Sequence, residues 1–379
     1  MITFVLATRD RPAELAQTLA AIAELPNPAG QPHELVVVDN ASAEPVRCPE
    51  ELTGGVRVRV IRNETNEGAA GRNVGVRSAS SDSEWVILLD DDSAPIDDGY
   101  LEALGEQPED VAAVTADITL PDGSRERGGL PEVPVGCGVA VRRWAFLAAG
   151  GYDHAFGFYA EEYDLSARLL LADRRVVFDP RFRVLHRKTS AGRDMDLILG
   201  RLVRNNGWVL QRFCPDDELE ARLAENETRY REIAARENAT GGFERGLAEL
   251  RETIGGQARL PMGPALWDRF TGLAAARDAI GAALEGEPFE RARIVEPGKN
   301  EWAVRTALGE LGVKVVDGDG AGDAARVIGT MSPGPMFDAA ERLANEPGRV
   351  ILPWRPSAAT SRFIDGREAG RARWGRPAA

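Results

Sequence analysis

One apolar run that ends in three carboxylates constrains this chain more than any other stretch. The run covers residues 85–89 (Trp-Val-Ile-Leu-Leu) and is followed directly by Asp90, Asp91 and Asp92. Its length and composition are typical of a buried strand. Adjacent acids repel one another and buried unpaired charge costs free energy, so packing does not explain them. Carboxylates that converge after a strand form a natural site for a hard divalent cation, and a solvated acidic turn is the alternative.

Strand and helix patterns alternate through the first ninety residues. The expected strands are 4–7, 35–38, 56–60 and 85–89, and the expected helices are 13–24 and 69–78. This order predicts an α/β fold with a mainly parallel, Rossmann-like central sheet and helices on both faces. Ligands of such sheets bind beyond the carboxyl ends of the strands. The polar residues that follow the strands should therefore lie on one rim.

The rest of the chain divides into further segments. Residues 135–141 form an apolar, glycine-containing run that suits a strand approached closely by a ligand. Short strands are expected at 176–178 and 184–186. Residues 194–285 have amphipathic helical patterns, and the pattern after Pro288 predicts a small βαβαβ module. The expected domains are residues 1–215, a helical region at 216–287, an accessory α/β domain at 288–355 and a basic, disordered tail at 356–379.

Composition excludes several classes of function. The net charge of −14 argues against nucleic-acid binding. The chain has no apolar run of about 18 residues and therefore no expected membrane span. Its N-terminus lacks the pattern of a signal peptide, and its three cysteines are too few and too widely spaced for a zinc framework. These features predict a cytoplasmic protein.

Two groups of motifs resemble the family 2 glycosyltransferases, which have the GT-A fold. The first group is Thr8-Arg9-Asp10-Arg11, Asp39-Asn40, the glycine-rich stretch 66–75 and Leu89-Asp90-Asp91-Asp92; the second is the run from Gly150 to Arg168. They follow the family's order and cover about residues 1–215. The resemblance implies an inverting, hexosyltransferase-type enzyme that moves a sugar from a nucleotide-diphosphate sugar to an acceptor hydroxyl.

The acidic triplet is the expected metal side of such a site. A divalent cation, Mn²⁺ or Mg²⁺, would stabilise charge that develops on the leaving diphosphate. Asp90 and Asp92 are the expected ligands and Asp91 is expected to point elsewhere, towards the ribose, although the assignment could shift by one residue. The resemblance makes His186 a third ligand, and a nitrogen ligand suits Mn²⁺ somewhat better than Mg²⁺. A structural hydrogen bond is the alternative for His186.

The resemblance also implies a nucleotide pocket. Thr8, Arg9 and Arg72 would line it, and Asp39 would bind the base, with a strand cap as the alternative for Asp39. Arg201 and Arg204 share one helix face and could complement the pyrophosphate. The alternative for these two arginines is a solvated helix face.

Three carboxylates cluster where a helix should begin, at Glu161, Glu162 and Asp164. Acids are favoured at a helix N-terminus, so capping is one reading. The functional reading makes one of them the general base that accepts the proton of the acceptor hydroxyl. The family usually has Glu-Asp at the first two positions, and this chain has Glu-Glu. We expect Glu162 to be the base, with Glu161 or Asp164 in reserve and with a pKa lowered by the helix.

The C-terminal module lies outside the resemblance. Its first turn, residues 296–300, opens a helix and could hold an anion. The module could shape the acceptor site, dock a partner or mediate a homodimer. The acceptor could be a polysaccharide, a lipid-linked precursor, a natural product or a peptide.

Two other functions fit parts of the sequence. A nucleotidyltransferase also places acids at strand ends, but it predicts glycine and lysine in the first loop, and residues 8–12 contain neither. A non-catalytic scaffold protein that binds a sugar nucleotide is the other alternative, and the intact acidic residues argue against it.

Overall fold

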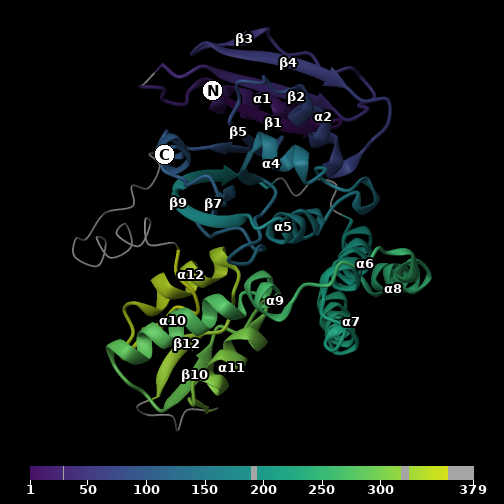
Figure 1. Cartoon of the computed structure of the whole chain (residues 1–379). Coiled ribbons are helices and arrows are strands. Elements are labelled where there is room, and N and C mark those ends of the chain that lie inside the picture. The colour runs from purple at the N-terminus through teal and green to yellow at the C-terminus, as the bar shows by residue number, and fades with distance from the viewer. Residues whose placement is uncertain (29, 189–193, 317–323, 357–379) are drawn as a thin grey trace.

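A nine-stranded sheet forms the centre of the N-terminal half. The computed structural model describes residues 1–28, 30–188, 194–316 and 324–356 (Figure 1). The strand order is β3-β4-β2-β1-β5-β8-β7-β9-β6. The strands are β1 (Ile2–Thr8), β2 (His33–Asp39), β3 (Glu51–Leu52), β4 (Val56–Arg62), β5 (Trp85–Asp90), β6 (Ser93–Pro95), β7 (Val111–Thr119), β8 (Gly138–Arg142) and β9 (Arg175–His186).

The direction of the strands changes across this sheet. β4, β2, β1 and β5 run parallel to one another, as the sequence predicts. β8 then runs antiparallel to both β5 and β7, while β7 and β9 pair in parallel. The expected α/β class is confirmed, with parallel strands at the centre and antiparallel pairs at β3, β8 and β6.

Helices cover both faces of the sheet because the side chains of a strand alternate between its faces. Phe4 and Leu6 pack with α1 (Pro12–Ala23) and α3 (Gly99–Gly105) on one face. Val5 packs with α2 (Gly71–Ser78), α4 (Arg143–Ala148) and α5 (Glu161–Leu171) on the other. A Cβ at Gly75 would lie 2.4 Å from Val5, so glycine lets α2 approach the sheet closely.

The prediction of two short strands at 176–178 and 184–186 is wrong. The structure has one strand, β9, of 12 residues. The polar residues between the two apolar parts stay in the sheet because they are paired: Arg181 bonds Asp179 at 2.7 Å and Glu106 at 2.5 Å. A shift in the pairing with β7 accommodates them.

The helical region and the C-terminal module follow. The helices are α6 (Met195–Phe213), α7 (Leu219–Arg236), α8 (Thr240–Thr253), α9 (Pro264–Thr271), α10 (Leu273–Gly286), α11 (Glu301–Glu310) and α12 (Pro333–Leu343). The module's parallel sheet has the order β11-β10-β12-β13, from β10 (Arg291–Val295), β11 (Lys314–Val315), β12 (Ala325–Ile328) and β13 (Val350–Ile351). Every helix in the described ranges is too short or too polar to span a membrane.

The C-terminal module packs directly against the N-terminal half, below it in Figure 1. Phe178 on β9 stacks on Phe337 of α12, with ring centroids 5.3 Å apart, and contacts Trp354 edge-on at 5.8 Å. Arg125 bonds Asp338 at 2.9 Å and Glu341 at 2.7 Å. The expected basic tail, apart from its first residue, lies outside the described residues.

Candidate active site

Two adjoining cavities open at the carboxyl ends of β1 and β5. The larger cavity has a volume of about 530 Å³ and the smaller one of about 210 Å³. Residues that line both are Arg11, Arg72, Asp90 and Phe158. The register of the sheet explains the convergence, because Ala7 on β1 lies beside Asp90 on β5 and Thr8 lies beside Asp39 on β2.

Asp91 is held within the protein. Its carboxylate accepts hydrogen bonds from Thr8 Oγ1 at 2.7 Å and from Arg11 at 2.6 Å. Its backbone carbonyl accepts a bond from Thr18 Oγ1 at 2.6 Å. Burial raises the pKa of Asp91 to about 6 against the opposing effect of these partners. Both carboxylate oxygens are engaged, so Asp91 fixes the start of α1 against the end of β5.

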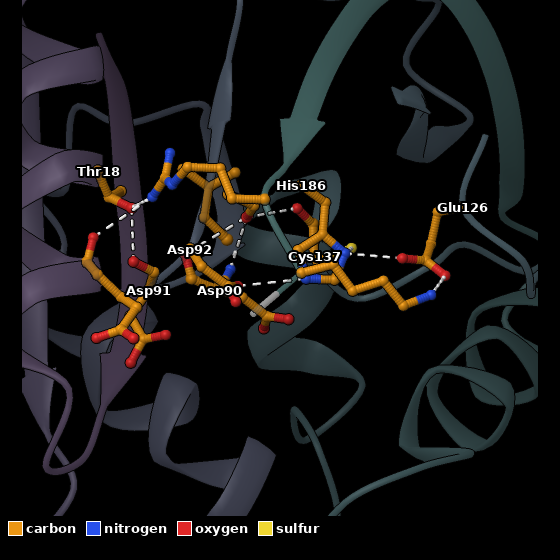
Figure 2. Close-up of polar contacts among 12 residues, drawn as sticks. Thr18, Asp90, Asp91, Asp92, Glu126, Cys137 and His186 are labelled. Atoms are coloured by element: carbon orange, nitrogen blue, oxygen red, sulfur yellow. Dashed lines mark hydrogen bonds and ion pairs between the residues drawn. The ribbon is translucent and has the colours of Figure 1, made fainter. Parts of the chain in front are cut away.

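Asp92 and His186 pair with each other (Figure 2). Asp92 bonds Arg11 at 2.8 Å and His186 Nε2 at 3.3 Å. His186 Nδ1 lies 2.8 Å from Glu126, whose other oxygen accepts a 2.6 Å bond from Lys188. Burial alone would lower the pKa of His186, but its bonds to Asp92, Cys137 and Glu126 raise it to about 12. The imidazole is therefore held as a cation between two carboxylates.

Asp90 is the carboxylate of the triplet that lines both cavities. Its side chain is 35% exposed and is bonded by Arg72, whose Nε also donates to Leu89 O at 3.1 Å. Ligand atoms of Asp90, Cys137 and His186 all lie within 4.8 Å of one another. A carboxylate, an imidazole and a thiol gathered at that spacing fit a divalent transition metal.

Glu161 and Glu162 lie side by side at the start of α5. Glu162 lines the larger cavity, and its Oε1 accepts a 3.0 Å hydrogen bond from the backbone N–H of Gly136. Glu161 is 4% exposed, and its Oε2 has no hydrogen-bond partner in the described parts of the chain. Burial raises the pKa of both carboxyls, and repulsion from Glu162 raises that of Glu161 further. The expectation of a pKa lowered by the helix is therefore wrong, because burial outweighs the helix N-terminus.

Known proteins resemble the N-terminal part of the chain, which carries the acidic triplet. Residues 3–155 match the family model described as glycosyl transferase family 2. The match covers less than half of the chain. An uncharacterized glycosyltransferase from Haemophilus influenzae is 30% identical over 196 residues, which span 45% of this chain and 62% of that protein. The aligned part therefore covers less than two thirds of the relative's length.

Solved structures give weaker similarity. GalNAc-T7 with UDP, GalNAc and Mn²⁺ has 18% identity and a TM-score of 0.49, covering 69% of this chain and 58% of its own. Residues 1–349 of S. aureus TarS have 13% identity and a TM-score of 0.47, covering 82% and 90%. The family match itself confirms the resemblance that the sequence motifs indicate.

The fold brings most of the expected metal ligands together. Asp90 and His186 lie within reach of one ion, with Cys137 as the third nearby group. Asp92 instead bonds His186 and Arg11. The protonated imidazole would have to lose a proton before it could coordinate, so metal binding and His186 titration are coupled.

Asp164, the other reserve base, is committed to ion pairs. It bonds Arg168 at 2.6 Å and Arg212 at 2.8 Å and is 1% exposed. It therefore ties α5 to α6 and lies away from both cavities.

The residues expected around the nucleotide separate into two groups. Thr8 and Arg9 line the smaller cavity, whereas Asp39 is 1% exposed and bonds Ser42 N at 2.8 Å and Arg62 at 2.7 Å. Burial would raise the pKa of Asp39, but these bonds lower it. The pattern is that of a strand cap.

The two helical arginines also differ from each other. Arg204 bonds Glu249 at 2.9 Å and stacks on Trp208 at 4.5 Å, so its contacts are structural. Arg201 lies 6.0 Å from the ring of Phe158, which lines both cavities.

Four residues of the candidate site were missing from the predicted set. Arg11 belongs to the first motif. Its position directly before Pro12 was the sequence feature that could have identified it as a site residue. Cys137 lies beside the glycine-containing strand, and Glu126 falls where the sequence pattern is weak. Lys299 comes from the C-terminal module and lines the larger cavity. Its Nζ bonds the Tyr163 hydroxyl and lies 4.3 Å from the ring centre, and burial lowers its pKa to about 8.

Proposed function

We propose that this protein is a metal-assisted glycosyltransferase that moves a sugar from a nucleotide-diphosphate sugar to an acceptor hydroxyl with inversion. The observation that carries the proposal is the position of Glu162. This carboxylate faces the same cavity as Asp90 and His186, is held by the Gly136 N–H, and has a raised pKa. A carboxylate with a raised pKa is a better general base than an exposed one.

The donor would extend across both cavities. The nucleoside would lie in the smaller cavity beside Thr8 and Asn40, and the sugar in the larger one. Arg11 and Arg72 line both, so their positive charge is placed where a diphosphate that spans the cavities would lie. These two arginines would offset part of the charge of the donor in a chain whose net charge is −14.

Asp90, His186 and Cys137 would hold the divalent ion, with Asp92 orienting His186. The ion, Mn²⁺ or Mg²⁺, supplies stabilisation of negative charge on the departing diphosphate.

The reaction is a single displacement at the anomeric carbon. The acceptor oxygen forms a bond to that carbon as the bond to the diphosphate oxygen breaks, and the electron pair leaves with the diphosphate. The proton of the acceptor hydroxyl passes to Glu162. Attack opposite the leaving group inverts the configuration, and the larger cavity has room for both sugar and acceptor at about 530 Å³.

Release of nucleoside diphosphate tests this function directly. Purified protein with Mn²⁺ is incubated with a panel of UDP- and GDP-sugars, with and without acceptors, beside nucleoside triphosphates. We expect at least one nucleotide sugar to be hydrolysed slowly in the absence of an acceptor. Glu162→Gln and Asp90→Asn should each lower the rate, whereas the exposed Glu109→Gln should not. Pyrophosphate release from a triphosphate, with no sugar nucleotide consumed, would overturn the proposal.

A further inference from the structure

A third cavity, of about 320 Å³, lies beside the larger cavity of the transfer site. We call it the helical cavity because its walls come from α6, α7, α9 and the loop that leads into α11. Tyr163 and Lys299 line both the helical cavity and the larger cavity. The two spaces therefore adjoin at this pair of side chains.

The lining of the helical cavity combines aromatic rings with amides. The aromatic residues are Tyr163, Trp267, Phe270 and Trp302, and the amides are Asn206, Asn226 and Asn300. Arg222 stacks on the ring of Trp302 at 3.6 Å. Rings offer apolar faces, and planar amides both donate and accept hydrogen bonds. This mixture suits a ligand with C–H faces and many hydroxyl groups, which is the chemistry of a sugar ring.

One buried donor in this cavity has no partner. Trp267 is 2% exposed, and its indole Nε1 makes no hydrogen bond within the part of the chain that the structure describes. Buried indole N–H groups normally have an acceptor, because an unpaired one has lost its hydrogen bond to water without replacing it. Trp267 lines the cavity, and an oxygen of a bound ligand that reaches Nε1 would complete its hydrogen bonding.

Resting on the proposed function, we propose that the helical cavity is an acceptor subsite for a sugar residue of a glycan at least two residues long. The terminal residue of the acceptor lies in the larger cavity beside Glu162, and the preceding residue occupies the helical cavity against Trp267. Lys299 stands at the junction and donates to an oxygen of the acceptor. Cavities that bind small ligands span roughly 300–1,000 Å³, and the helical cavity is large enough for one ring.

Acceptor length is the variable that tests the subsite. Wild-type protein, with Mn²⁺ and a nucleotide sugar that it hydrolyses, is assayed on a panel of mono-, di- and trisaccharides, both neutral and uronate-containing. We expect KM to fall between a monosaccharide and the matching disaccharide. Trp267→Phe removes the N–H and keeps a ring, and should raise KM for the disaccharide ~5-fold while KM for the monosaccharide changes less than twofold.

Trp144→Phe is the matched control, because Trp144 is 47% exposed and lines none of the three cavities. Lys299→Met is a second variant, in case Trp267→Phe lowers the melting temperature below the assay range. It too should reduce the preference for the disaccharide.

The outcomes separate the two proposals. Wild-type protein that hydrolyses no nucleotide sugar would overturn the proposed function and the subsite together. Hydrolysis without any preference for longer acceptors would overturn the subsite and leave the proposed function standing. A preference that survives in both Trp267→Phe and Lys299→Met would also overturn it.

Discussion

The backbone N–H of Gly136 donates a 3.0 Å hydrogen bond to Oε1 of Glu162, and a Cβ at position 136 would lie 2.5 Å from that same oxygen. The carboxylate thus occupies the space that a methyl group would take. A glycine at this position both orients the expected base and leaves room for it.

Gly136→Ala should therefore reduce transfer without unfolding the protein. The new methyl displaces the carboxylate, which ends a flexible side chain, so the melting temperature changes little. Because general-base catalysis contributes about 10²–10⁴-fold, we expect kcat to fall tenfold or more. Steady-state kinetics and thermal melts measure the two effects. Gly105→Ala, where a Cβ meets nothing within 4 Å, is the control.

The pH dependence of transfer should report the raised pKa of Glu162. The base acts when it is ionised, so activity is lost as the pH falls through a value above the ordinary glutamic acid pKa of about 4.3. Burial also keeps the neighbouring Glu161 protonated to higher pH. In a kcat profile, Glu161→Gln should leave the acid limb in place, because Glu161 is still uncharged in the pH range where Glu162 ionises. A limb that moves to lower pH would show that Glu161 is ionised together with Glu162 and repels it.

Removal of the metal should abolish transfer, and added Mn²⁺ should restore it. Because His186 must lose a proton to coordinate, the apparent affinity for Mn²⁺ should increase as the pH rises from about 6 to about 8. Cys137→Ser should weaken Mn²⁺ binding in a calorimetric titration. Cys48→Ser, a half-buried thiol outside the cavities, is the control. Equal affinities for both variants would remove Cys137 from the ligand set.

Asp164→Asn should cost stability. The change leaves Arg168 and Arg212 without their shared carboxylate, and breaking a buried pair typically costs about 3–5 kcal/mol. Chemical denaturation measures the loss. Asp110→Asn is the comparison, because its pair with Arg175 is 3.2 Å long with both side chains more than 40% exposed, and such pairs contribute about 0–1 kcal/mol. Similar losses for the two variants would contradict the structural role.

Because Lys299 is buried, the free energy of unfolding should increase as the pH rises from about 8 to 10.5. Burial lowers its pKa from 10.5 to about 8, so in this window the unfolded chain binds more protons than the folded one. Free energies of unfolding across the window measure the slope, which Lys299→Met should flatten. Lys314→Met, on an exposed strand residue, should leave the slope unchanged.

Local patterns were sufficient for much of the fold. The parallel strands β2, β1 and β5 are continuous apolar runs followed by polar residues, and those runs predict both the strands and the rim where Thr8 and Asp90 meet. β7 and the middle of β9 were not predicted. Their polar residues, such as Asp117 and Arg181, are paired with partners outside their own strands, and no local pattern reveals such pairing.

The same distinction between local pattern and tertiary packing applies to the residues of the site. Asp90, Glu162 and His186 follow recognisable elements, so their types and places could be predicted. The partners that Asp39 and Asp164 find, and the arrival of Lys299 from the C-terminal module, depend on tertiary packing. A pKa is equally non-local, and the helix position of Glu162 gave the wrong sign because burial decides it.

The stack of Phe178 on Phe337 has a consequence for how such a chain can change over time. Phe178 lies near the start of β9, and His186 is the last residue of the same strand. Replacement of the C-terminal module by another domain through recombination would remove Phe337. Phe178 would then be exposed, and the strand that positions His186 would be disturbed. New acceptor preferences would then arise more readily from point substitutions in α7, α9 and the loop before α11 than from exchange of whole domains.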